Sequence, residues 1–238
     1  MIIILGFDGL EYEYVKKFGC RNLMQKHFGK TDLSQFSEPR TIVLWSSFLT
    51  GKNQEKRILS GDLWTFKLKK EETFFNHFKN FYVLDTPGYN YSEDHKKERD
   101  ALRAFFEKKG TVENYDEVAF ENHKKIKEQF FNALNSGTNF DIVMGYFGVA
   151  DVVGHLSFGL EEKMKIIYNE LDEITRKVQE KHPDATILIV SDHGMKKIGR
   201  FGDHSNYAFW SLNIDKNLGN PKTTDFYSMI INNFKMSS

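Results

Sequence analysis

Short, almost uninterrupted apolar runs constrain the fold of this chain more than any other feature of its sequence. They are Ile2–Phe7, Phe81–Leu84, Ile142–Phe147, Thr186–Val190 and Tyr207–Leu212. Runs with so little polar content are typical of strands that are buried on both faces of a sheet. Longer segments with helical periodicity separate them. This alternation predicts an α/β fold, arranged as a three-layer αβα sandwich around a central, largely parallel sheet.

The helical segments are recognised by the spacing of their apolar residues. The expected helices are Glu71–Phe78, Glu98–Lys108, Asp116–Leu134, Glu161–Glu180 and Thr224–Phe234. In the fourth segment, apolar residues from Met164 to Val178 recur at intervals of three and four. They therefore form one stripe that faces the sheet. Pro183 follows and is expected to stop this helix.

The length of the chain, 238 residues, suits one substantial domain. The sequence contains no internal repeat and no low-complexity linker, so residues 1–238 are expected to form a single globular domain of ordinary composition. The segment Pro87–Val112 is the least regular, because a Pro-Gly-Tyr-Asn-Tyr stretch precedes a dense run of charges. Such a run is usually a solvated loop and surface helix. A small cap within residues 87–112 is the second interpretation, since long insertions often serve as lids.

Charge and cysteine content bound the partners and the compartment. Lysine plus arginine number 33, and aspartate plus glutamate also number 33. The chain therefore has no excess of positive charge that would favour a nucleic acid or an anionic membrane as partner. The single cysteine, Cys20, excludes an intramolecular disulfide and fits a reducing compartment. The run Ile2–Phe7 is too short to span a bilayer and lacks the basic leader of a secretory signal, so we expect a soluble, cytoplasmic protein.

Aspartates and histidines gather at the ends of the predicted strands. Asp8 follows the first run, Asp151 and His155 follow the third, Asp192 and His193 follow the fourth, and His204 precedes the last. In an open α/β sheet, ligands bind at the carboxyl ends of the strands. Each residue alone has a simpler explanation, such as a turn aspartate, a local hydrogen-bonded pair or a surface histidine. Together, three carboxylates and three imidazoles suit two divalent transition metals such as zinc, manganese or iron.

The remaining polar signals do not add to this set. No cysteine accompanies the aspartates and histidines, which argues against a closed structural zinc site. The other histidines are His27, His77, His95, His123 and His182, all on helical or charged stretches. We interpret these five as surface residues.

A nucleophile candidate lies between Pro39 and Gly51. Val43–Leu49 predicts a short apolar helix that Gly51 can end in a left-handed cap. Thr41 then lies at the helix start, where backbone N–H groups and the helix dipole favour a phosphate. On this segment alone, Thr41 is better explained as an N-cap. It becomes a credible nucleophile because metal ligands accompany it: a metal lowers the pKa of a bound water by about nine units, and an alcohol should respond similarly.

The ordered set of motifs resembles the alkaline phosphatase superfamily, and most of all its type I phosphodiesterase/nucleotide pyrophosphatase branch. The matching motifs are Gly6-Phe-Asp-Gly9, Thr41-Ile-Val-Leu-Trp-Ser-Ser-Phe-Leu-Thr-Gly51, Asp151-Val-Val-Gly-His155, Ser191-Asp-His-Gly-Met195 and His204, with weaker matches at Leu84-Asp-Thr-Pro-Gly-Tyr89 and Thr224-Asp-Phe-Tyr-Ser-Met-Ile-Ile231. Asp-His-Gly after an apolar strand, with Asp-x-x-x-His upstream, is a specific combination. The motifs span nearly the whole chain, so the resemblance implies an alkaline phosphatase-like fold throughout.

The resemblance also implies a mechanism. One metal would be held by Asp8, Asp192, His193 and Thr41, and the other by Asp151, His155 and His204. Two divalent ions, zinc or alternatively manganese, would lie about 3.5–4 Å apart and clamp the attacking and leaving oxygens of an in-line displacement. Thr41 would attack phosphorus, and water would later hydrolyse the phosphothreonine. The implied activity is metal-dependent hydrolysis of a phosphoric ester, with a small phosphate ester or a nucleotide as substrate.

The sequence departs from the family pattern after Gly51. The family commonly continues with a His-Gly-Ile element and an asparagine that helps to hold a phosphate oxygen, whereas this chain reads Lys52-Asn-Gln-Glu-Lys-Arg-Ile-Leu-Ser-Gly-Asp62. Asn53, Arg57 and Asp62 are the candidates for substrate contacts here, although a carboxylate at Asp62 would repel a phosphate. The alternatives are a phosphomonoesterase, a phosphoglycerate mutase-like enzyme, and a metal-binding relative without catalytic activity.

Overall fold

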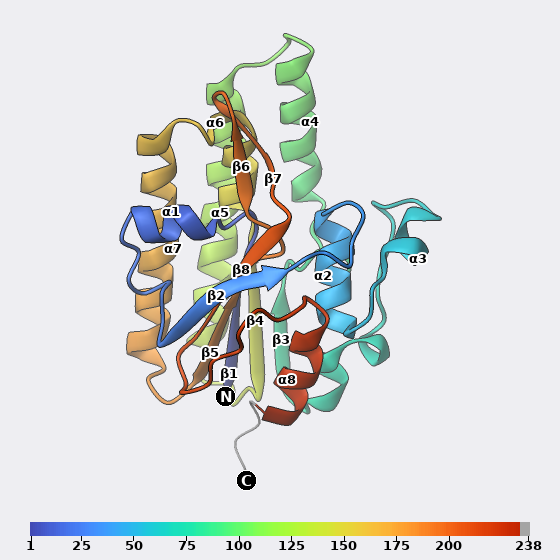
Figure 1. The fold of residues 1–238 in the computed structure, drawn as a ribbon, viewed down its shortest axis with the longest axis vertical. Coiled ribbons are helices and arrows are strands. Elements are labelled where there is room, and N and C mark those ends of the chain that lie inside the picture. Colours follow the sequence, from blue (N-terminus) through green and yellow to red (C-terminus); the bar gives the residue numbers. More distant parts are fainter. Residues whose placement is uncertain (234–238) are drawn as a thin grey trace.

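The computed structural model describes residues 1–233 and is built on a six-stranded sheet (Figure 1). The strands run in the order β2-β8-β5-β1-β4-β3. Their bounds are His27–Asp32 for β2, Tyr207–Leu212 for β8, Thr186–Val190 for β5, Ile2–Phe7 for β1, Ile142–Phe147 for β4 and Phe81–Leu84 for β3. β1 is parallel to β4 and β5, β3 is parallel to β4, and β8 is antiparallel to β5 and β2. The predicted α/β fold with a largely parallel central sheet is confirmed.

The five apolar runs form strands at the residues predicted for them, whereas β2 was not predicted. β2 reads His-Phe-Gly-Lys-Thr-Asp, and all of its residues except Thr31 are only partly buried. It lies at one edge of the sheet, where β8 is its neighbouring strand and Asp32 forms an isolated bridge with Lys222. An edge strand with so few apolar residues lacks the sequence signal that a doubly buried strand carries.

β1 shows how the sheet divides the core. Ile3, Leu5 and Phe7 belong to one apolar cluster, whereas Ile2 and Ile4 belong to another, because successive side chains of a strand point to opposite faces. The first face is covered by α1 (Tyr12–Lys17), α5 (Val112–Leu134), α6 (Val149–Ser157) and α7 (Glu161–Lys181), and the second by α2 (Thr41–Thr50), the 3-10 turn η2 (Phe74–His77) and α8 (Asp225–Asn233). Helices on both faces complete the three layers (Figure 1).

One predicted helix is wrong. Instead of a single helix over Glu71–Phe78, the chain forms two 3-10 turns, η1 (Lys70–Glu72) and η2. Thr73 between them has an extended backbone, with φ −107° and ψ 160°. Phe74 and Phe75 follow directly and are both fully buried. Two adjacent buried rings require tight local turns here rather than the single apolar stripe of an α-helix.

Other helix boundaries differ by a turn or less. α4 spans Asp94–Phe106, so it begins and ends earlier than expected. α5 begins at Val112 because Thr111 caps it, accepting a hydrogen bond from the Asn114 N–H. The short α3 spans Glu55–Leu59. Phe234, the expected end of the last helix, lies outside the described residues. Among residues 1–233, none of the helices has both the length and the apolar character that crossing a membrane requires.

A two-stranded ribbon extends beyond the carboxyl end of the sheet (Figure 1). In it, β6 (Met195–Ile198) runs antiparallel to β7 (Phe201–His204), and Met195 lies opposite His204. The ribbon leaves the end of β5 and returns to it. It therefore brings His204 back beside His193, and the two rings stack with their centroids 3.6 Å apart.

Candidate metal centre

The carboxyl ends of three neighbouring strands supply the candidate metal centre. Asp8 follows β1, Asp192 and His193 follow β5, and α6 after β4 carries Asp151 and His155. β7 contributes His204. Because β1 lies between β4 and β5 in the sheet, these residues meet at one edge. The structure brings all six together as two groups, in each of which the possible ligand atoms lie within 4.8 Å of one another.

A glycine makes the close meeting of β1 and α6 possible. Gly9, directly after Asp8, has φ +67°, and a Cβ on it would lie 2.8 Å from the Asp151 Cα. A side chain at residue 9 would thus be strained by its backbone conformation and would collide with α6. The Gly9 N–H also donates to Asp192 Oδ1 over 3.4 Å. Residue 9 therefore ties the ends of three elements together.

The first group, Asp8, Asp192 and His193, is fully buried. His193 Nε2 lies 3.3 Å from Asp8 Oδ1 and 3.4 Å from Asp192 Oδ2. Tyr146, on β4, donates its hydroxyl hydrogen to Asp8 Oδ2. One oxygen of Asp8 is thereby held by the tyrosine, while the other points to His193.

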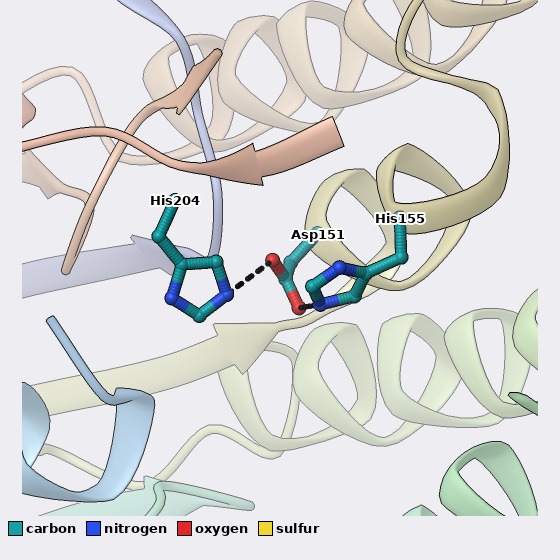
Figure 2. A group of neighbouring side chains, drawn as sticks. All are labelled: Asp151, His155 and His204. Atoms are coloured by element: carbon teal, nitrogen blue, oxygen red, sulfur yellow. Dashed lines mark ion pairs between the residues drawn. The ribbon is translucent and has the colours of Figure 1, made fainter. Parts of the chain in front are cut away.

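The second group, Asp151, His155 and His204, is more open (Figure 2). His155 lies one helical turn after Asp151 on α6, and its Nε2 is 3.2 Å from Asp151 Oδ2. His204 Nε2 approaches the other oxygen, Oδ1, to 3.6 Å. The same Oδ1 is 3.9 Å from His193 Nε2. Asp151 thus lies between the two groups and joins them into one site.

Backbone carbonyl groups orient the imidazoles. His204 Nδ1 lies 2.6 Å from the Pro39 carbonyl oxygen, and His193 Nδ1 lies 3.0 Å from that of Gly194. A ring nitrogen facing a carbonyl oxygen must carry the hydrogen, so Nε2 of each neutral ring keeps its lone pair. Both Nε2 atoms face the carboxylates. This is the tautomer that metal binding requires.

Burial, together with crowding of like charges, raises the pKa of the carboxyl groups in the first group. Burial raises the pKa of Asp8 well above its ordinary value, and the neighbouring carboxylates of Asp192 and Asp151 raise it further. Burial also raises the pKa of Asp192 to about 7. Two buried carboxyl groups that resist ionisation favour a nearby positive charge. A bound cation would supply it.

The second group already contains some compensation. Burial would raise the pKa of Asp151, but the adjacent His155 holds it below its ordinary value. In turn, Asp151 raises the pKa of His155 to about 9. Burial and the neighbouring His193 lower the pKa of His204 to about 4, so His204 is a neutral imidazole at pH 7.

Buried polar atoms without hydrogen-bond partners indicate whether metals fit this site. Within residues 1–233, no hydrogen bond reaches Asp8 Oδ1, Asp151 Oδ1, Asp192 Oδ2 or His193 Nε2, although all are buried. Each such atom costs about 1–3 kcal/mol, so their meeting at one point is unfavourable unless a ligand pairs them. In a tetrahedral site with bonds of about 2.0–2.1 Å, ligand atoms lie roughly 3.3 Å apart. The distances of 3.3 Å and 3.4 Å around His193 agree with this value, so the residues fit divalent metals.

Thr41 is the first residue of α2 and faces the same site. Arg40, not Thr41, is the N-cap residue, so the interpretation of Thr41 as an N-cap is wrong. Gly51 ends α2 in the left-handed conformation, as predicted. Nine of the ten helix residues are buried, which anchors the helix. Thr41 itself is partly exposed and lines the cavity described next.

A cavity of about 330 Å³ opens beside the candidate metal centre. Asp8, Thr41, Asp151, His155 and His204 line one end of it. The other walls are mostly apolar or aromatic and come from Leu63, Trp64, Tyr91, Leu102, Tyr115 and Val152. Leu102 belongs to α4, and Tyr91 lies in the segment just before it. Residues 87–112 thus contribute a wall of the cavity as well as a solvated helix face.

The three expected substrate contacts, Asn53, Arg57 and Asp62, are not among the described residues that line this cavity. Asn53 donates to the Gln35 carbonyl oxygen over 2.7 Å. Arg57 forms an ion pair with Glu72. Asp62 accepts from the Trp64 N–H over 2.9 Å. None of the three is a lining residue of the cavity within the described chain.

Arg40 and Tyr146 are functional candidates that the sequence did not suggest. Arg40 lines the cavity next to Thr41 and pairs with Glu38 over 2.6 Å. Its place directly before Thr41 was the available signal. Tyr146 lies inside an apolar run and looked like a core residue, so nothing local marked its hydroxyl as a partner of Asp8.

Similar folds occur among solved structures. Murine ectonucleotide pyrophosphatase/phosphodiesterase 5 has a TM-score of 0.52 and 14% identity, with 84% of this chain and 58% of that chain covered. Alkaline phosphatase from the Antarctic bacterium TAB5 has a TM-score of 0.55 and 10% identity, with 99% and 98% covered. A sulfatase from Pseudoalteromonas sp. has a TM-score of 0.51 and 11% identity, with 98% and 68% covered. At these identities the likeness shows the fold alone.

Sequence comparison defines the family. No curated protein matches the chain. The family model for type I phosphodiesterase/nucleotide pyrophosphatase matches residues 2–210. This match covers most of the chain and contains every residue of the candidate metal centre. The chain therefore belongs to the type I phosphodiesterase/nucleotide pyrophosphatase family.

Proposed function

We propose that this protein is a two-metal phosphodiesterase in which Thr41 is the nucleophile. The observation that carries the proposal is the set of buried, unpaired oxygen and nitrogen atoms that face one another at the end of the cavity. One metal is assigned to Asp8, Asp192, His193 and Thr41, and the other to Asp151, His155 and His204. Zinc is the first choice and manganese the second, since both accept mixed nitrogen and oxygen ligands.

The residues of the chain have separate tasks in this reaction. Bound metal would lower the pKa of the nucleophile and neutralise charge on the phosphate oxygens. Thr41 Oγ1 forms a bond to phosphorus as the bond to the leaving oxygen breaks, and water then hydrolyses the phosphothreonine. The N–H groups in the first turn of α2 favour the phosphate through the helix dipole. Arg40 offers a guanidinium to the non-bridging oxygens.

The cavity supports a substrate with one apolar or aromatic substituent next to the phosphate. Its walls away from the candidate metal centre are mostly Leu, Trp, Tyr and Val side chains. Murine ectonucleotide pyrophosphatase/phosphodiesterase 5 has been solved, as an inactive form, in complex with AMP. We therefore infer a nucleotide or a related small ester as substrate. The segment 87–112 acts as a small cap of the single domain, because α4 forms one wall of this cavity.

The test compares two substrates on the same protein. After metal removal, zinc or manganese is restored, and hydrolysis of bis-p-nitrophenyl phosphate is compared with that of p-nitrophenyl phosphate. Faster metal-dependent turnover of the diester supports the proposal. No turnover of either substrate, with both metals shown to be bound, contradicts it.

Arg40 gives a specific reason to keep a phosphomonoesterase as the second candidate. A guanidinium can bind two oxygens of one phosphate at once. A monoester dianion has more charge and one more free oxygen than a diester for such a contact. Preference for p-nitrophenyl phosphate that is lost in Arg40→Gln would favour this second function.

A further inference from the structure

A second buried cluster of charges lies beside the cavity, to whose lining two of its residues, His95 and Glu98, contribute. It consists of Asp85, His95 and Glu98, and we call it the His95 cluster. His95 Nε2 lies 2.6 Å from Asp85 Oδ2, and His95 Nδ1 lies 2.6 Å from Glu98 Oε2. The His95 side chain is only 1% exposed. The interpretation of His95 as a surface residue is therefore wrong.

Every polar group around His95 has a partner. Asn122 on α5 donates to Glu98 Oε1 over 2.8 Å, and the Ser92 N–H donates to Asp85 Oδ1 over 2.7 Å. Both ring nitrogens of His95 face carboxylates, so both carry hydrogens and the ring is an imidazolium. Burial alone would lower the pKa of His95, but the bonds to Asp85 and Glu98 raise it to about 9.

The local backbone is also unusual. Asp85, which follows β3, has φ +58°. This left-handed conformation is unfavourable for a residue with a side chain. A buried ion cluster is in general weak evidence for stability, because apolar residues of the same volume often replace it without loss. The cluster therefore needs an explanation beyond packing.

The aromatic neighbours of His95 connect it to the candidate metal centre. Tyr91 stacks on the His95 ring with centroids 4.0 Å apart and planes 13° apart. Tyr146 meets the same ring edge to face at 5.9 Å, and it meets Tyr91 at 5.8 Å. Tyr146 is also the residue whose hydroxyl holds Asp8 Oδ2. All three rings line the cavity.

We propose that His95 is a positioning residue that sets Asp8 for metal binding through Tyr146. Held by two carboxylates, the ring cannot turn, and it fixes the planes of Tyr91 and Tyr146. Tyr146 then keeps Asp8 Oδ2 occupied, so that Asp8 Oδ1, which has no hydrogen-bond partner in residues 1–233, faces His193 and the metal. This inference rests on the proposed function, because it concerns the same metal site.

A purely structural role makes a different prediction. The His95 cluster joins the end of β3, α4 and α5 through Asp85, Glu98 and Asn122. If it only held these elements together, its loss would lower stability to the same extent whether or not Tyr146 had its hydroxyl. If His95 acts through Tyr146, replacing His95 should weaken zinc binding only while Tyr146 keeps its hydroxyl group.

The experiment is a double-mutant cycle with zinc affinity as the readout. The dissociation constant is measured by competition with a chromophoric chelator for the native chain, His95→Gln, Tyr146→Phe and the double variant. We expect His95→Gln to weaken zinc binding about 10-fold, the lower end of the range for residues that orient a ligand. In the Tyr146→Phe background, the same change should have an effect of less than about twofold.

A matched control comes from α5. His123 is also buried, at 8% exposure, so its interpretation as a surface residue is wrong as well. It pairs with Glu170 but is not among the described residues that line the cavity. His123→Gln should keep the native zinc affinity. If His95→Gln does not fold, Glu98→Gln replaces it in the cycle, since the amide keeps an acceptor for the ring while removing one charge. The expected weakening is then about threefold with Tyr146 and none without it.

Two results overturn the proposal: native zinc affinity in the folded variants, or equal losses in both backgrounds. The measurement needs no turnover, so it is separable from the proposed function. A chain that binds zinc but hydrolyses no ester contradicts the proposed function and still decides the role of His95. A native chain that binds no zinc overturns both.

Discussion

The candidate metal centre and the His95 cluster both bury histidine among carboxylates, but they differ in whether the polar atoms have partners. At the candidate metal centre, Asp8 Oδ1, Asp192 Oδ2 and His193 Nε2 make no hydrogen bond to any described residue. In the His95 cluster, both ring nitrogens meet a carboxylate oxygen at 2.6 Å. Buried charge alone therefore does not identify a ligand site. Buried polar atoms that converge on one point without hydrogen-bond partners do indicate such a site, because proteins rarely leave such atoms unsatisfied.

The two clusters also differ in their charge balance. Around His193, burial raises the pKa values of Asp8 and Asp192, and the neighbouring carboxylates raise them further. Around His95, the ring provides a positive charge within the cluster. The first arrangement favours an added cation, and the second is complete without one.

The largest expected effect comes from removing the proposed nucleophile, Thr41, beside the candidate metal centre. Thr41→Ala should lower kcat by about 10³-fold or more, because the proposed mechanism assigns the nucleophile to Thr41 alone. The unfolding midpoint in urea should change little, and Thr41→Ser should recover part of the turnover. Turnover of the restored zinc form is the measurement. Full activity in Thr41→Ala would break the assignment of catalysis to this end of the cavity.

The next largest effect is the loss of stability on metal removal, which should depend on the candidate metal centre and much less on the His95 cluster. A chelator should lower the free energy of unfolding by about 4 kcal/mol relative to zinc at 1,000 times its dissociation constant. Asp192→Asn should lose most of this response, because Asp192 supplies an unpaired oxygen. Asp85→Asn should keep most of it. Equal responses in the two variants, measured by urea unfolding with and without zinc, would contradict the comparison.

The third effect is the pH dependence of the His95 cluster. The folded pKa of His95 is about 9, above its ordinary value of 6.5. Its contribution to stability is therefore complete below about pH 6.5 and is lost as the pH rises through 9. The carboxylates of Asp85 and Glu98 face the ring, and burial raises the pKa of Tyr91 and Tyr146 well above the ordinary value, so neither phenol ionises in this window.

Urea unfolding of the zinc form between pH 6 and 10 measures this contribution. The difference in free energy of unfolding between the native chain and His95→Gln should fall by up to about 3 kcal/mol across the window. When Glu98→Gln takes the place of the native chain in this comparison, the difference in free energy of unfolding should fall at lower pH. The reason is that one of the charges that raise the pKa of His95 is gone. A difference that stays constant from pH 6 to 10 would show that the ring does not carry a charge in the folded protein.

The two clusters were not equally accessible from the sequence. The aspartates and histidines of the candidate metal centre could be placed at one edge because they follow apolar runs, and parallel strands end at the same edge. His204 was the least direct case, since the β6–β7 ribbon that returns it to His193 has exposed lysines and no apolar run. The resemblance to a known family, in which His204 is the last of the ordered motifs, assigned His204 to the site, whereas periodicity did not.

The His95 cluster gave no such signal. His95 lies in a dense run of charges from Glu93 to Arg99, which by composition reads as a solvated helix face. Its burial arises only because α4 packs on α5 and brings Asn122 to Glu98. The left-handed Asp85 is equally invisible in the sequence. Long-range pairing of charged residues has no periodicity, so composition alone cannot separate a buried charge from an exposed one.

The smallest effect extends the comparison to two paired arginines. Arg40 pairs with Glu38 and Arg57 with Glu72, and each arginine side chain is 50% exposed. Only Arg40 lines the cavity. Exposed ion pairs contribute about 0–1 kcal/mol to stability, so neither substitution should change the unfolding midpoint much. Arg40→Gln should raise KM about 10-fold, through loss of a charged hydrogen bond worth about 1.5 kcal/mol to the phosphate, whereas Arg57→Gln should leave KM unchanged. A raised KM in Arg57→Gln and an unchanged KM in Arg40→Gln would instead assign the phosphate contact to the segment after Gly51, as the sequence predicted.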